Sequence, residues 1–311
     1  MKISAVIPTC ETKWNQGLTF CFFSKLHRKP DEVIVVLDAD KEAIESDLLF
    51  GVPVKIIHTK VRGAAIKRNL GVKNSSGEAV LFVDDDVEFF PNSVQALEEI
   101  LEANNTIGGV GCFIKNQSFS KPRIYSYLVF KLSGGWRICD FSGKCFGPMI
   151  NLFPQAKGNS KKFIKSDWLN TTMTLYRRKA LPCPVFDLYF SGYSYGEDLA
   201  LSLRVKKQWQ IGNATESYIV HHSKPSSYKA NQYDLQKMII KNKFYILTKI
   251  QNSNQFSAAI LITWVEILYL PLNLIKKILQ NSKKSLRGVL SGLIEIWMYI
   301  FFKHYAQRNF L

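Results

Sequence analysis

The sequence predicts an α/β fold, with a doubly wound and mostly parallel sheet and flanking helices, followed by a C-terminal α-helical region. Apolar runs of strand length alternate with helical segments over about the first 90 residues, which is typical of βαβ units. Several runs stop at polar or acidic residues, as buried strands do at the sheet edge where ligands bind. The last third of the chain is basic and apolar and lacks this alternation. We therefore divide the chain into residues 1–225 and 226–311.

The strands of the first part are short, apolar and abruptly terminated. Residues 3–7 stop at Pro8 and Thr9, and the valine-rich residues 32–37 stop at Asp38. Because the carboxyl ends of parallel strands meet at one edge of a sheet, we expect Thr9 and Asp38 to converge there. The elements predicted in this part are strands at 3–7, 32–37, 54–57 and 80–83 and helices at 18–26 and 64–72.

Three carboxylates, Asp84, Asp85 and Asp86, follow the strand at 80–83 directly, and a helix opens after Pro91. Adjacent acids repel one another, so such a cluster is favoured when a cation lies among them. On an extended backbone Asp84 and Asp86 project to one side and Asp85 to the other, which suits a divalent metal that bridges a diphosphate. This stretch alone leaves open the alternative of a solvated acidic turn.

Acids and histidines recur later in the chain, after a weaker signal over residues 108–158. We expect a strand at 168–176, a helix within residues 193–204 and a strand at 217–220. Glu197 and Asp198 open the helix, where the helix dipole favours negative charge, so an ordinary acidic first turn is the alternative to a functional role. His221 and His222 follow the last strand. Since alternate side chains point to opposite faces, one of them could reach a metal, and the sequence leaves open which.

The C-terminal region combines apolar helices with positive charge. Residues 224–311 hold thirteen Lys and Arg against three acids, in a chain of net charge +16. Helices are expected at 233–250, 258–272 and 288–302, with Pro271 interrupting the second, and the apolar runs fall short of the ~20 residues that span a bilayer. Flanking lysines and aromatic side chains favour helices that lie in the interface of an anionic membrane. A helical cap on the rest of the protein and a homo-oligomer interface are the alternatives.

Composition narrows the classes of protein. With 47% apolar residues the chain is no disordered protein, and its net charge of +16 indicates an anionic partner: a nucleic acid, a nucleotide diphosphate or an anionic membrane surface. Its six cysteines show no CxxC pair and no zinc-site spacing. The N-terminus lacks the basic start and long apolar core of a signal peptide. We therefore expect a cytoplasmic protein, peripheral on the cytosolic face of the membrane.

Taken in order, the motifs of about residues 2–250 resemble those of the family 2 glycosyltransferases and, more loosely, of their rhamnosyltransferase-type members. The segments that carry the resemblance are SAVIPT (4–9), EVIVVLD (32–38), RGAAIKRNLG (62–71), FVDDDVEFFP (82–91), LNTTMTLYRR (169–178), GEDLALSLR (196–204) and the histidines after Val220. The resemblance implies the GT-A fold, which is Rossmann-like. It also implies metal-dependent, inverting transfer of a sugar from a nucleotide-diphosphate sugar to a hydroxyl of a saccharide or lipid-linked acceptor, in cell-surface glycan or glycolipid synthesis.

The resemblance further implies roles for single residues. Asp84 and Asp86 match the DxD pair, with Asp86 ligating Mg²⁺ or Mn²⁺ and Asp84 facing the ribose or the metal. His221 or His222 matches a position where some members supply a further metal ligand. The residues implied in nucleotide-sugar binding are Pro8, Thr9, Glu11, Asp38, Arg62, Arg68, Asp84, Asp85 and Trp168.

Asp198 matches the catalytic base of the family, and Glu197 stands beside it. This assignment agrees with the chemistry that the reaction requires. A carboxylate within hydrogen-bond reach of the acceptor hydroxyl takes its proton as attack proceeds. Such a direct displacement inverts the anomeric centre.

Other classes of protein fit the sequence less well. A sugar nucleotidyltransferase would be expected to carry a glycine-rich, lysine- or arginine-bearing loop after its first strand, and residues 8–14 offer none. A non-enzymatic nucleic-acid-binding module would explain the positive charge. Base-reading motifs are absent, however, and much of the charge lies beside apolar helices, so we expect no nucleic-acid partner. A catalytically inactive membrane scaffold is disfavoured while all the acids are present.

Overall fold

The computed structural model describes residues 1–10, 23–40, 43–49, 51–117, 120–155, 161–190, 194–222, 231–280 and 285–302. The chain divides into two compact units. The first comprises Met1–Phe119, Ser142–Lys144 and Leu152–Ser223, and the second comprises Ser120–Phe141, Cys145–Asn151 and Lys224–Leu311. Glu11 and residues 18–22 of the helix predicted at 18–26 lie outside the described residues.

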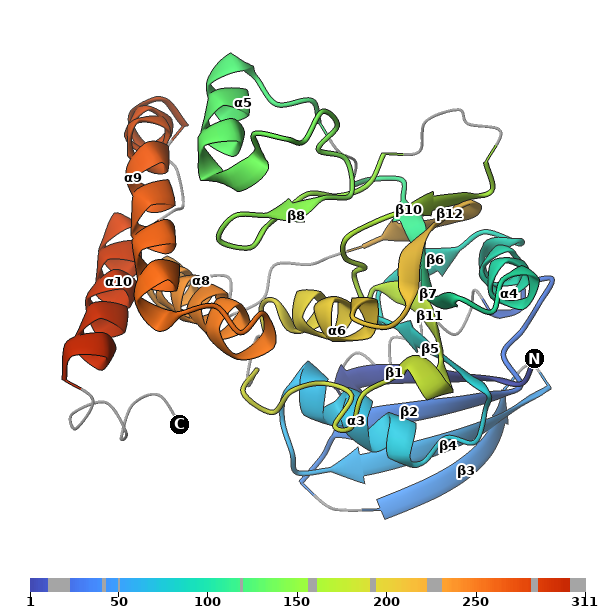
Figure 1. The fold of residues 1–311 in the computed structure, drawn as a ribbon. Coiled ribbons are helices and arrows are strands. Elements are labelled where there is room, and N and C mark those ends of the chain that lie inside the picture. The colour runs from blue at the N-terminus through green and yellow to red at the C-terminus, as the bar shows by residue number, and fades with distance from the viewer. Residues whose placement is uncertain are drawn as a thin grey trace. The chain divides into compact units, whose positions relative to one another are not determined.

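The first unit is built on one large sheet. Its strands are β1 (Ile3–Cys10), β2 (Glu32–Asp38), β3 (Ala43–Leu49), β4 (Val52–Thr59), β5 (Ala79–Val83), β6 (Val87–Phe89), β7 (Ile107–Ile114), β10 (Phe163–Lys165), β11 (Met173–Arg177) and β12 (Gln210–His221). Among the described residues the order is β10-β12-β7-β11-β5-β1-β2-β4-β3, with β6 paired to β12. The neighbours β4, β2, β1 and β5 are parallel, and antiparallel pairs follow towards both edges. The predicted α/β fold is confirmed (Figure 1).

Alternation along the buried strand β1 explains how helices cover both faces of the sheet. Ile3 and Ile7 belong to the same apolar cluster as Leu97 of α4 (Ser93–Ala103). The intervening Val6 belongs to a second cluster, with Ala65 of α3 (Ala64–Lys73) and residues of α6 (Glu197–Lys206). A short 3-10 helix, η2 (Arg178–Ala180), follows β11. α3 and α6 therefore lie on one face of the sheet and α4 on the other.

The parallel register brings the ends of three strands to one edge. Cys10 is opposite Asp38 across the β1–β2 pair, and Val6 is opposite Phe82 across the β1–β5 pair. Three residues beyond this last pair, Thr9 is level with the acidic loop that follows β5. The edge on which the predicted polar residues converge is thus set by hydrogen-bonded register.

Two predicted strand boundaries were wrong. The strand expected at 168–176 begins only at Met173, because the backbone before it bonds elsewhere: the Leu169 N–H donates to Ser202 Oγ, and the Thr172 carbonyl accepts from the Asp84 N–H. The strand expected at 217–220 is only the end of β12, which begins at Gln210. The expectation that Glu197 and Asp198 open a helix is confirmed: α6 begins at Glu197, after Gly196, whose left-handed backbone (φ 89°) a helix cannot continue through. The edge strand β3 was not predicted.

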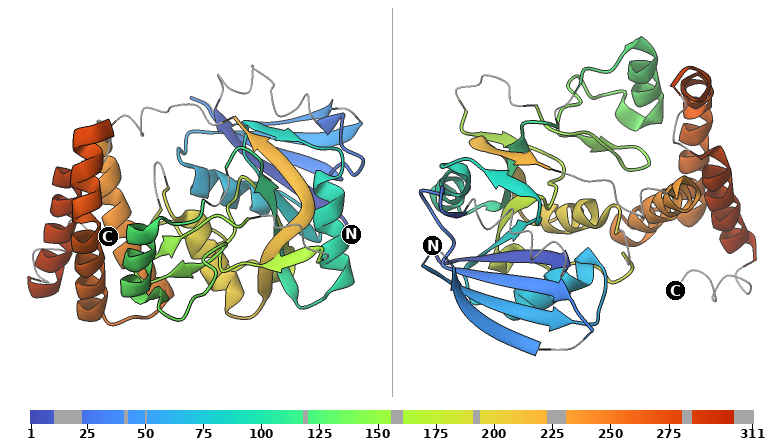
Figure 2. Two further views of the ribbon diagram at one scale, coloured as in Figure 1. Left: turned by 90° about the horizontal axis from the view of Figure 1, so that it is seen from above. Right: turned by 180° about the vertical axis from the view of Figure 1, so that it is seen from behind.

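The second unit is mainly helical. It contains α5 (Ile124–Phe130), the π-helical turn η1 (Lys131–Gly135), the short strands β8 (Cys145–Phe146) and β9 (Ile150–Asn151), and then α8 (Gln232–Tyr245), η3 (Ile246–Ile250), α9 (Gln255–Gln280) and α10 (Leu286–Phe301). Ile240 and Phe244 of α8 form an apolar cluster with Ile262 of α9 and Ile296 of α10. Figure 2 shows these three helices side by side in both views. The expected C-terminal helical region is present.

Glycine allows α10 to approach α8 closely. A Cβ atom at Gly288 would lie 2.3 Å from the Tyr233 carbonyl oxygen, and one at Gly292 would lie 2.9 Å from Ile240 Cβ.

Pro271 does not interrupt the second predicted helix of the C-terminal region, contrary to the prediction. α9 runs through Pro271 to Gln280 and loses one backbone hydrogen-bond donor there. None of the helices in the described part of the chain combines the length and the apolar character needed to cross a bilayer.

Candidate active site

The acidic loop after β5 forms the centre of the site. Asp84, Asp85 and Asp86 are half-buried and stand between β5 and β6. The Thr9 hydroxyl at the end of β1 donates to Asp85 Oδ2 at 2.7 Å, and the Asp84 N–H donates to the Thr172 carbonyl at 3.0 Å. The loop is therefore fixed from two sides, by β1 and by the segment that leads into β11.

Asp84, Asp86 and His221 form a group that could hold a metal ion. Each offers one ligand atom, and the three atoms lie within 4.8 Å of one another. His221 Nε2 lies 3.0 Å from Asp86 Oδ1, because the antiparallel β6–β12 pairing places His221 opposite Val87. Carboxylate oxygens are ligands that Mg²⁺ and Mn²⁺ prefer, and an imidazole is a common ligand of divalent transition metals. The residues present therefore fit the predicted cation.

The two adjacent histidines have different partners. His222 Nε2 lies 3.1 Å from Glu88 Oε2, and its backbone N–H donates to the Asp86 carbonyl. The ring of His221, by contrast, has a nitrogen within 4.8 Å of carboxylate oxygens of Asp84 and Asp86. Alternation along β12 separates the two rings, and the pairing with β6 decides which ring faces Asp86.

Two residues that the sequence analysis did not single out hold His221 in place. The Asn116 side chain donates to the His221 carbonyl at 2.7 Å and accepts from the His221 N–H at 3.1 Å. The amide of Gln117 lies 3.4 Å from His221 Nδ1. An amide pair one residue beyond the end of the apolar strand β7 was a signal that could have been read, since it lies near a strand end like the acids after β5.

Arg68 connects the acidic loop to α6. Its guanidinium is buried, donates to Asp84 Oδ1 at 2.7 Å and also donates to Glu197 Oε1. Within the described part of the structure, Glu197 Oε2 and Arg68 Nε are buried without a hydrogen-bond partner. Burial raises the pKa of Glu197 to about 7, and the charge of Arg68 opposes this rise. The resemblance implied that Arg68 neighbours the base and diphosphate; the structure places it in this buried ion network.

Asp198 occupies the first turn of α6, next to Glu197. Its carboxylate is half-buried, and Oδ1 accepts from the Leu199 N–H at 2.7 Å. Burial raises the pKa of Asp198 to about 6, and the Leu199 hydrogen bond and the Arg68 charge limit the rise. Because Arg68 bonds both Asp84 and the neighbouring Glu197, Asp198 is held near the acidic loop while its own side chain keeps some exposure.

Lys67 organises the ends of β1 and β2. Its buried ammonium group lies 2.9 Å from Asp38 Oδ1 and donates to the Thr9 carbonyl at 2.6 Å. Thr9 and Asp38, predicted to line a nucleotide pocket, are thus held together by a cation that was not assigned to the site. Asp38 itself is half-exposed.

The remaining predicted residues differ in their surroundings. Pro8 is buried within β1, and Arg62 is exposed in the loop before α3. The Trp168 indole is buried, donates from Nε1 to the Leu152 carbonyl at 3.0 Å and packs on Phe153. Trp168 precedes Leu169, whose N–H bonds Ser202 of α6.

Comparison with known proteins gives one family. The sequence model of the family described as Glycosyl transferase family 2 matches residues 4–183. An uncharacterized glycosyltransferase of Haemophilus influenzae is 33% identical over 94 residues, which are 29% of this chain and 32% of that protein. One of Rickettsia bellii is 33% identical over 159 residues, which are 50% of this chain and 21% of that protein. The chain thus matches only a third or less of these relatives' length.

Solved structures share the fold at low sequence identity. TarS of S. aureus, determined with UDP-GlcNAc, has a TM-score of 0.55 at 13% identity, over 96% of this chain and 81% of that one. The mannosyltransferase PcManGT of Pyrobaculum calidifontis, determined with GDP-Man and Mn²⁺, has a TM-score of 0.54 at 12% identity, over 97% of this chain and 87% of that one. The arrangement of strands and helices described above is therefore one that TarS and the mannosyltransferase PcManGT also adopt.

Proposed function

Since the chain belongs to glycosyl transferase family 2, we propose that it transfers a sugar from a nucleotide-diphosphate sugar to a hydroxyl group of a saccharide or lipid-linked acceptor. The reaction is metal-dependent and inverts the anomeric centre, and the sugar is a hexose or deoxyhexose. The observation that carries the proposal is the single network of Asp84, Arg68 and Glu197, which joins the acids of a candidate cation site to the helix that bears Asp198.

The donor end of the reaction is assigned to the strand ends and the acidic loop. Asp84, Asp86 and His221 would hold the cation, Mg²⁺ or Mn²⁺. When bound, this cation offsets the negative charge that the departing nucleoside diphosphate gains. Asn116 and Gln117 keep His221 in position. That similar folds were determined with UDP-GlcNAc and with GDP-Man and Mn²⁺ supports a donor of this class.

The nucleoside is assigned to the other half of the same edge. Asp38 accepts a hydrogen bond from the base, and Lys67 orients its carboxylate and the Thr9 carbonyl. The exposed Arg62 is free to approach the phosphates, and Pro8, Asp85, Glu11 and Trp168 complete the proposed binding residues. Arg68 acts through Asp84 and Glu197 instead of through direct contact with the donor.

Asp198 is the proposed catalytic base. With a pKa of about 6 it is ionised at neutral pH and still basic enough to accept the proton of an acceptor hydroxyl. Glu197, beside it, is bound to Arg68, so its contribution is to fix the first turn of α6 and balance the buried cation. A carboxylate base without a covalent intermediate gives direct displacement and hence inversion.

The C-terminal helices are proposed to hold the enzyme on the cytosolic face of a membrane, near a lipid-linked acceptor of cell-surface glycan or glycolipid synthesis. Apolar side chains of α9 and α10 are exposed, among them Trp264 and Ile294. Exposed apolar faces in a region of net positive charge favour an anionic membrane interface. A homo-oligomer interface is the competing use of the same surface.

The first experiment identifies the donor. The thermal stability of the protein is measured with UDP, GDP and dTDP sugars, with and without Mn²⁺, because a ligand that binds only the folded state raises its stability. We expect one nucleotide class to stabilise the protein and Asp86→Ala to remove the Mn²⁺-dependent part. Stabilisation by no sugar nucleotide would refute the proposal.

The second experiment tests the base. Asp198→Asn should lower the turnover rate by about 10²–10⁴-fold, because it removes general-base catalysis, and leave the donor affinity within about twofold. Asp167→Asn is the matched control, since Asp167 is an acid that pairs with Lys206 at the other end of α6. Full turnover by Asp198→Asn would remove Asp198 from this role.

A further inference from the structure

The middle segment of the second unit exposes a stripe of apolar side chains. On α5 and η1, Ile124, Leu128 and Leu132 follow one another at a spacing of four residues and are 84%, 52% and 58% exposed. Trp136, directly after η1, is 65% exposed. Exposure of each of these side chains to water is unfavourable, and its burial lowers the free energy. So many large apolar groups within thirteen residues indicate a surface that another phase or molecule covers.

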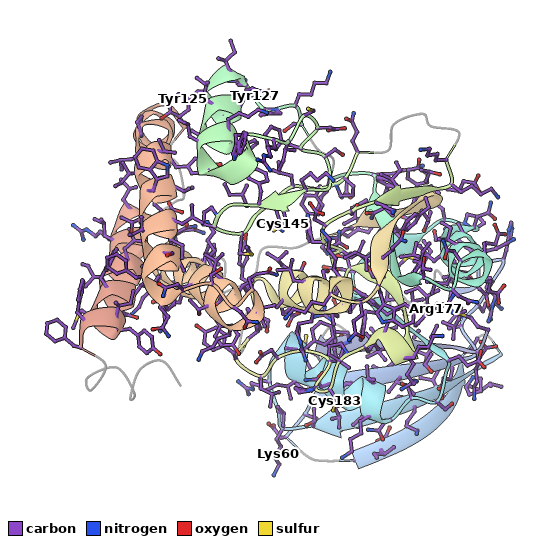
Figure 3. All side chains as sticks on the ribbon, viewed as in Figure 1. Lys60, Tyr125, Tyr127, Cys145, Arg177 and Cys183 are labelled. Carbon is purple, nitrogen blue, oxygen red and sulfur yellow. The ribbon has the colours of Figure 1, made fainter. Side chains whose placement is uncertain are left out.

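This stripe adjoins an exposed stripe on α9. Ile260, Trp264 and Ile267 are 47%, 46% and 55% exposed at helical spacing. The Trp264 indole N–H donates to the Leu132 carbonyl at 3.3 Å, and the Tyr125 hydroxyl donates to the Leu268 carbonyl at 2.7 Å. Figure 3 shows Tyr125 on α5 beside α9. Two segments of the chain, more than a hundred residues apart, therefore form one apolar surface.

The acids of the long helices do not belong to this surface. Glu266 of α9 is buried and lies 3.4 Å from Lys243 Nζ of α8. Glu295 of α10 pairs with Lys237 and with Lys241 of α8. Because lysines of α8 neutralise both carboxylates, neither carboxylate repels an anionic membrane that contacts the exposed stripes.

Positive charge surrounds the α5 stripe. Lys121, Arg123, Lys131 and Arg137 lie within residues 121–137, and the sequence has no acid from residue 116 to 139. Lys121, Arg123 and Arg137 are exposed, and the Arg137 guanidinium lies 4.3 Å from the centre of the Trp136 ring. Aliphatic residues beside Trp, Tyr and cations are the combination found at the headgroup level of membranes.

We propose that α5, η1 and Trp136 insert with α9 into the interface of a bilayer that contains anionic lipid, so that the middle of the chain forms part of the membrane-binding surface. The proposal rests on the membrane attachment proposed above and extends it to a segment outside the C-terminal helices. Lipid is favoured over a second copy of the chain, because a symmetric contact through this segment would bring its four cations against four more.

The test uses the full chain and co-sedimentation with vesicles of phosphatidylcholine, alone or with phosphatidylglycerol. Ile124→Ser/Leu128→Ser should lower the partition coefficient at least about tenfold, since two apolar side chains no longer gain burial. Arg123→Glu/Arg137→Glu should weaken binding to the anionic vesicles only. The control, Ile44→Ser/Leu188→Ser, changes two side chains of the first unit that are 63% and 59% exposed, and should bind as the wild type does.

Three outcomes would overturn the proposal, and each is separable from failure of the proposed function. If Leu290→Ser/Ile294→Ser on α10 weakens binding while Ile124→Ser/Leu128→Ser does not, the membrane attachment stands and the role of α5 falls. If Ile124→Ser/Leu128→Ser instead converts a dimer to a monomer, a second copy covers the surface. If the wild type binds no vesicles, both membrane assignments fail. Donor binding, measured by thermal shift without lipid, decides the transferase proposal independently, and circular dichroism confirms that each variant is folded.

Discussion

Arg68 is a buried cation between carboxylates of two different elements, Asp84 after β5 and Glu197 at the start of α6. We expect Arg68→Met to lower the free energy of unfolding by about 3–5 kcal/mol near neutral pH, because it leaves buried carboxylates without their partner. The charge of Arg68 opposes the raised pKa of Glu197, so in the variant that pKa rises further. The loss of unfolding free energy in Arg68→Met arises when Glu197 is ionised. It should therefore become smaller at acidic pH, where Glu197 is protonated.

Urea unfolding at about pH 8 and about pH 5.5 checks this, with the larger difference between variant and wild type expected at the higher pH. Lys206→Met, which removes an exposed cation from the same helix, should stay within about 0.5 kcal/mol of the wild type at both values. An equal loss for Arg68→Met at the two pH values would mean that packing, and not charge, is what Arg68 supplies.

The raised pKa of Asp198 predicts the pH at which activity falls on acidification, that is, the acid limb of the pH–rate profile. Only the ionised carboxylate accepts a proton, so kcat/KM should fall about tenfold per pH unit below pH 6. Rates across pH at saturating Mn²⁺ measure the limb. Glu197→Gln should retain it, and the residual activity of Asp198→Asn should lack it. The same limb in Asp198→Asn would assign the titration to another group.

The sequence predicted which residues lie together at the edge of the sheet better than it predicted the contacts that each of them makes. Asp84 to Asp86, Thr9 and Asp38 were found because each stands at the end of an apolar strand, and parallel strands end together. The ion pair of Arg68 and Glu197 joins residues 129 positions apart, and no local pattern encodes it. Likewise, His221 and His222 are equivalent in sequence, and only the pairing of β12 with β6 distinguishes them.

At the scale of elements, the contact between α3 and β1 positions two site residues, Lys67 and Arg68. A Cβ atom at Gly71 would lie 2.3 Å from Cγ1 of the fully buried Val6. Gly71→Ala would gain about 1 kcal/mol of helix propensity, yet we expect a net loss of about 1–3 kcal/mol in the free energy of unfolding, because α3 must move away from the sheet.

Denaturant unfolding measures this loss, and the affinity for the donor should fall with it. Val6→Ala removes the two methyl groups that would clash with a side chain at position 71. Gly71→Ala should therefore cost less stability when it is made in Val6→Ala than when it is made in the wild type. Additive losses in the double variant would show that the two residues do not compete for this space.

The elements that sequence analysis missed are those whose local pattern is ambiguous. β1, β2 and β5 are continuous apolar runs and were recognised, whereas β3 is an edge strand with three polar residues in AIESDLL. The segment IYSYLVF reads as β-prone from its Tyr, Val and Phe content but forms α5, since tertiary contacts override a weak propensity. Its Tyr125 hydrogen bond to Leu268 belongs to contacts that composition cannot reveal.

At the scale of the whole molecule, the chain does not divide at one point into a sheet unit and a helical unit. Residues 120–141 and 145–151 leave the first unit and join the C-terminal helices, and residues 142–144 return to the first. Sequence analysis detected the change of composition near residue 225. It gave no signal that residues 120–141 and 145–151 also belong to the second unit. Removal of the C-terminal helices therefore affects a unit that begins more than a hundred residues before them.

A chain that ends after Asn254 should accordingly be a poor soluble version of the protein. It retains α8 but loses α9 and α10, which cover the buried side chains Ile240, Phe244 and Leu247. Exposure of each costs about 1.5–3 kcal/mol, so we expect aggregation or strong binding of a hydrophobic dye. Hydrogen exchange should still show protected amides in β1 and β5, because their clusters contain no residue of the second unit. A monomeric truncated chain that binds no dye would contradict the shared core of α8, α9 and α10. It would also make truncation, instead of substitution of exposed residues, the better test of membrane attachment.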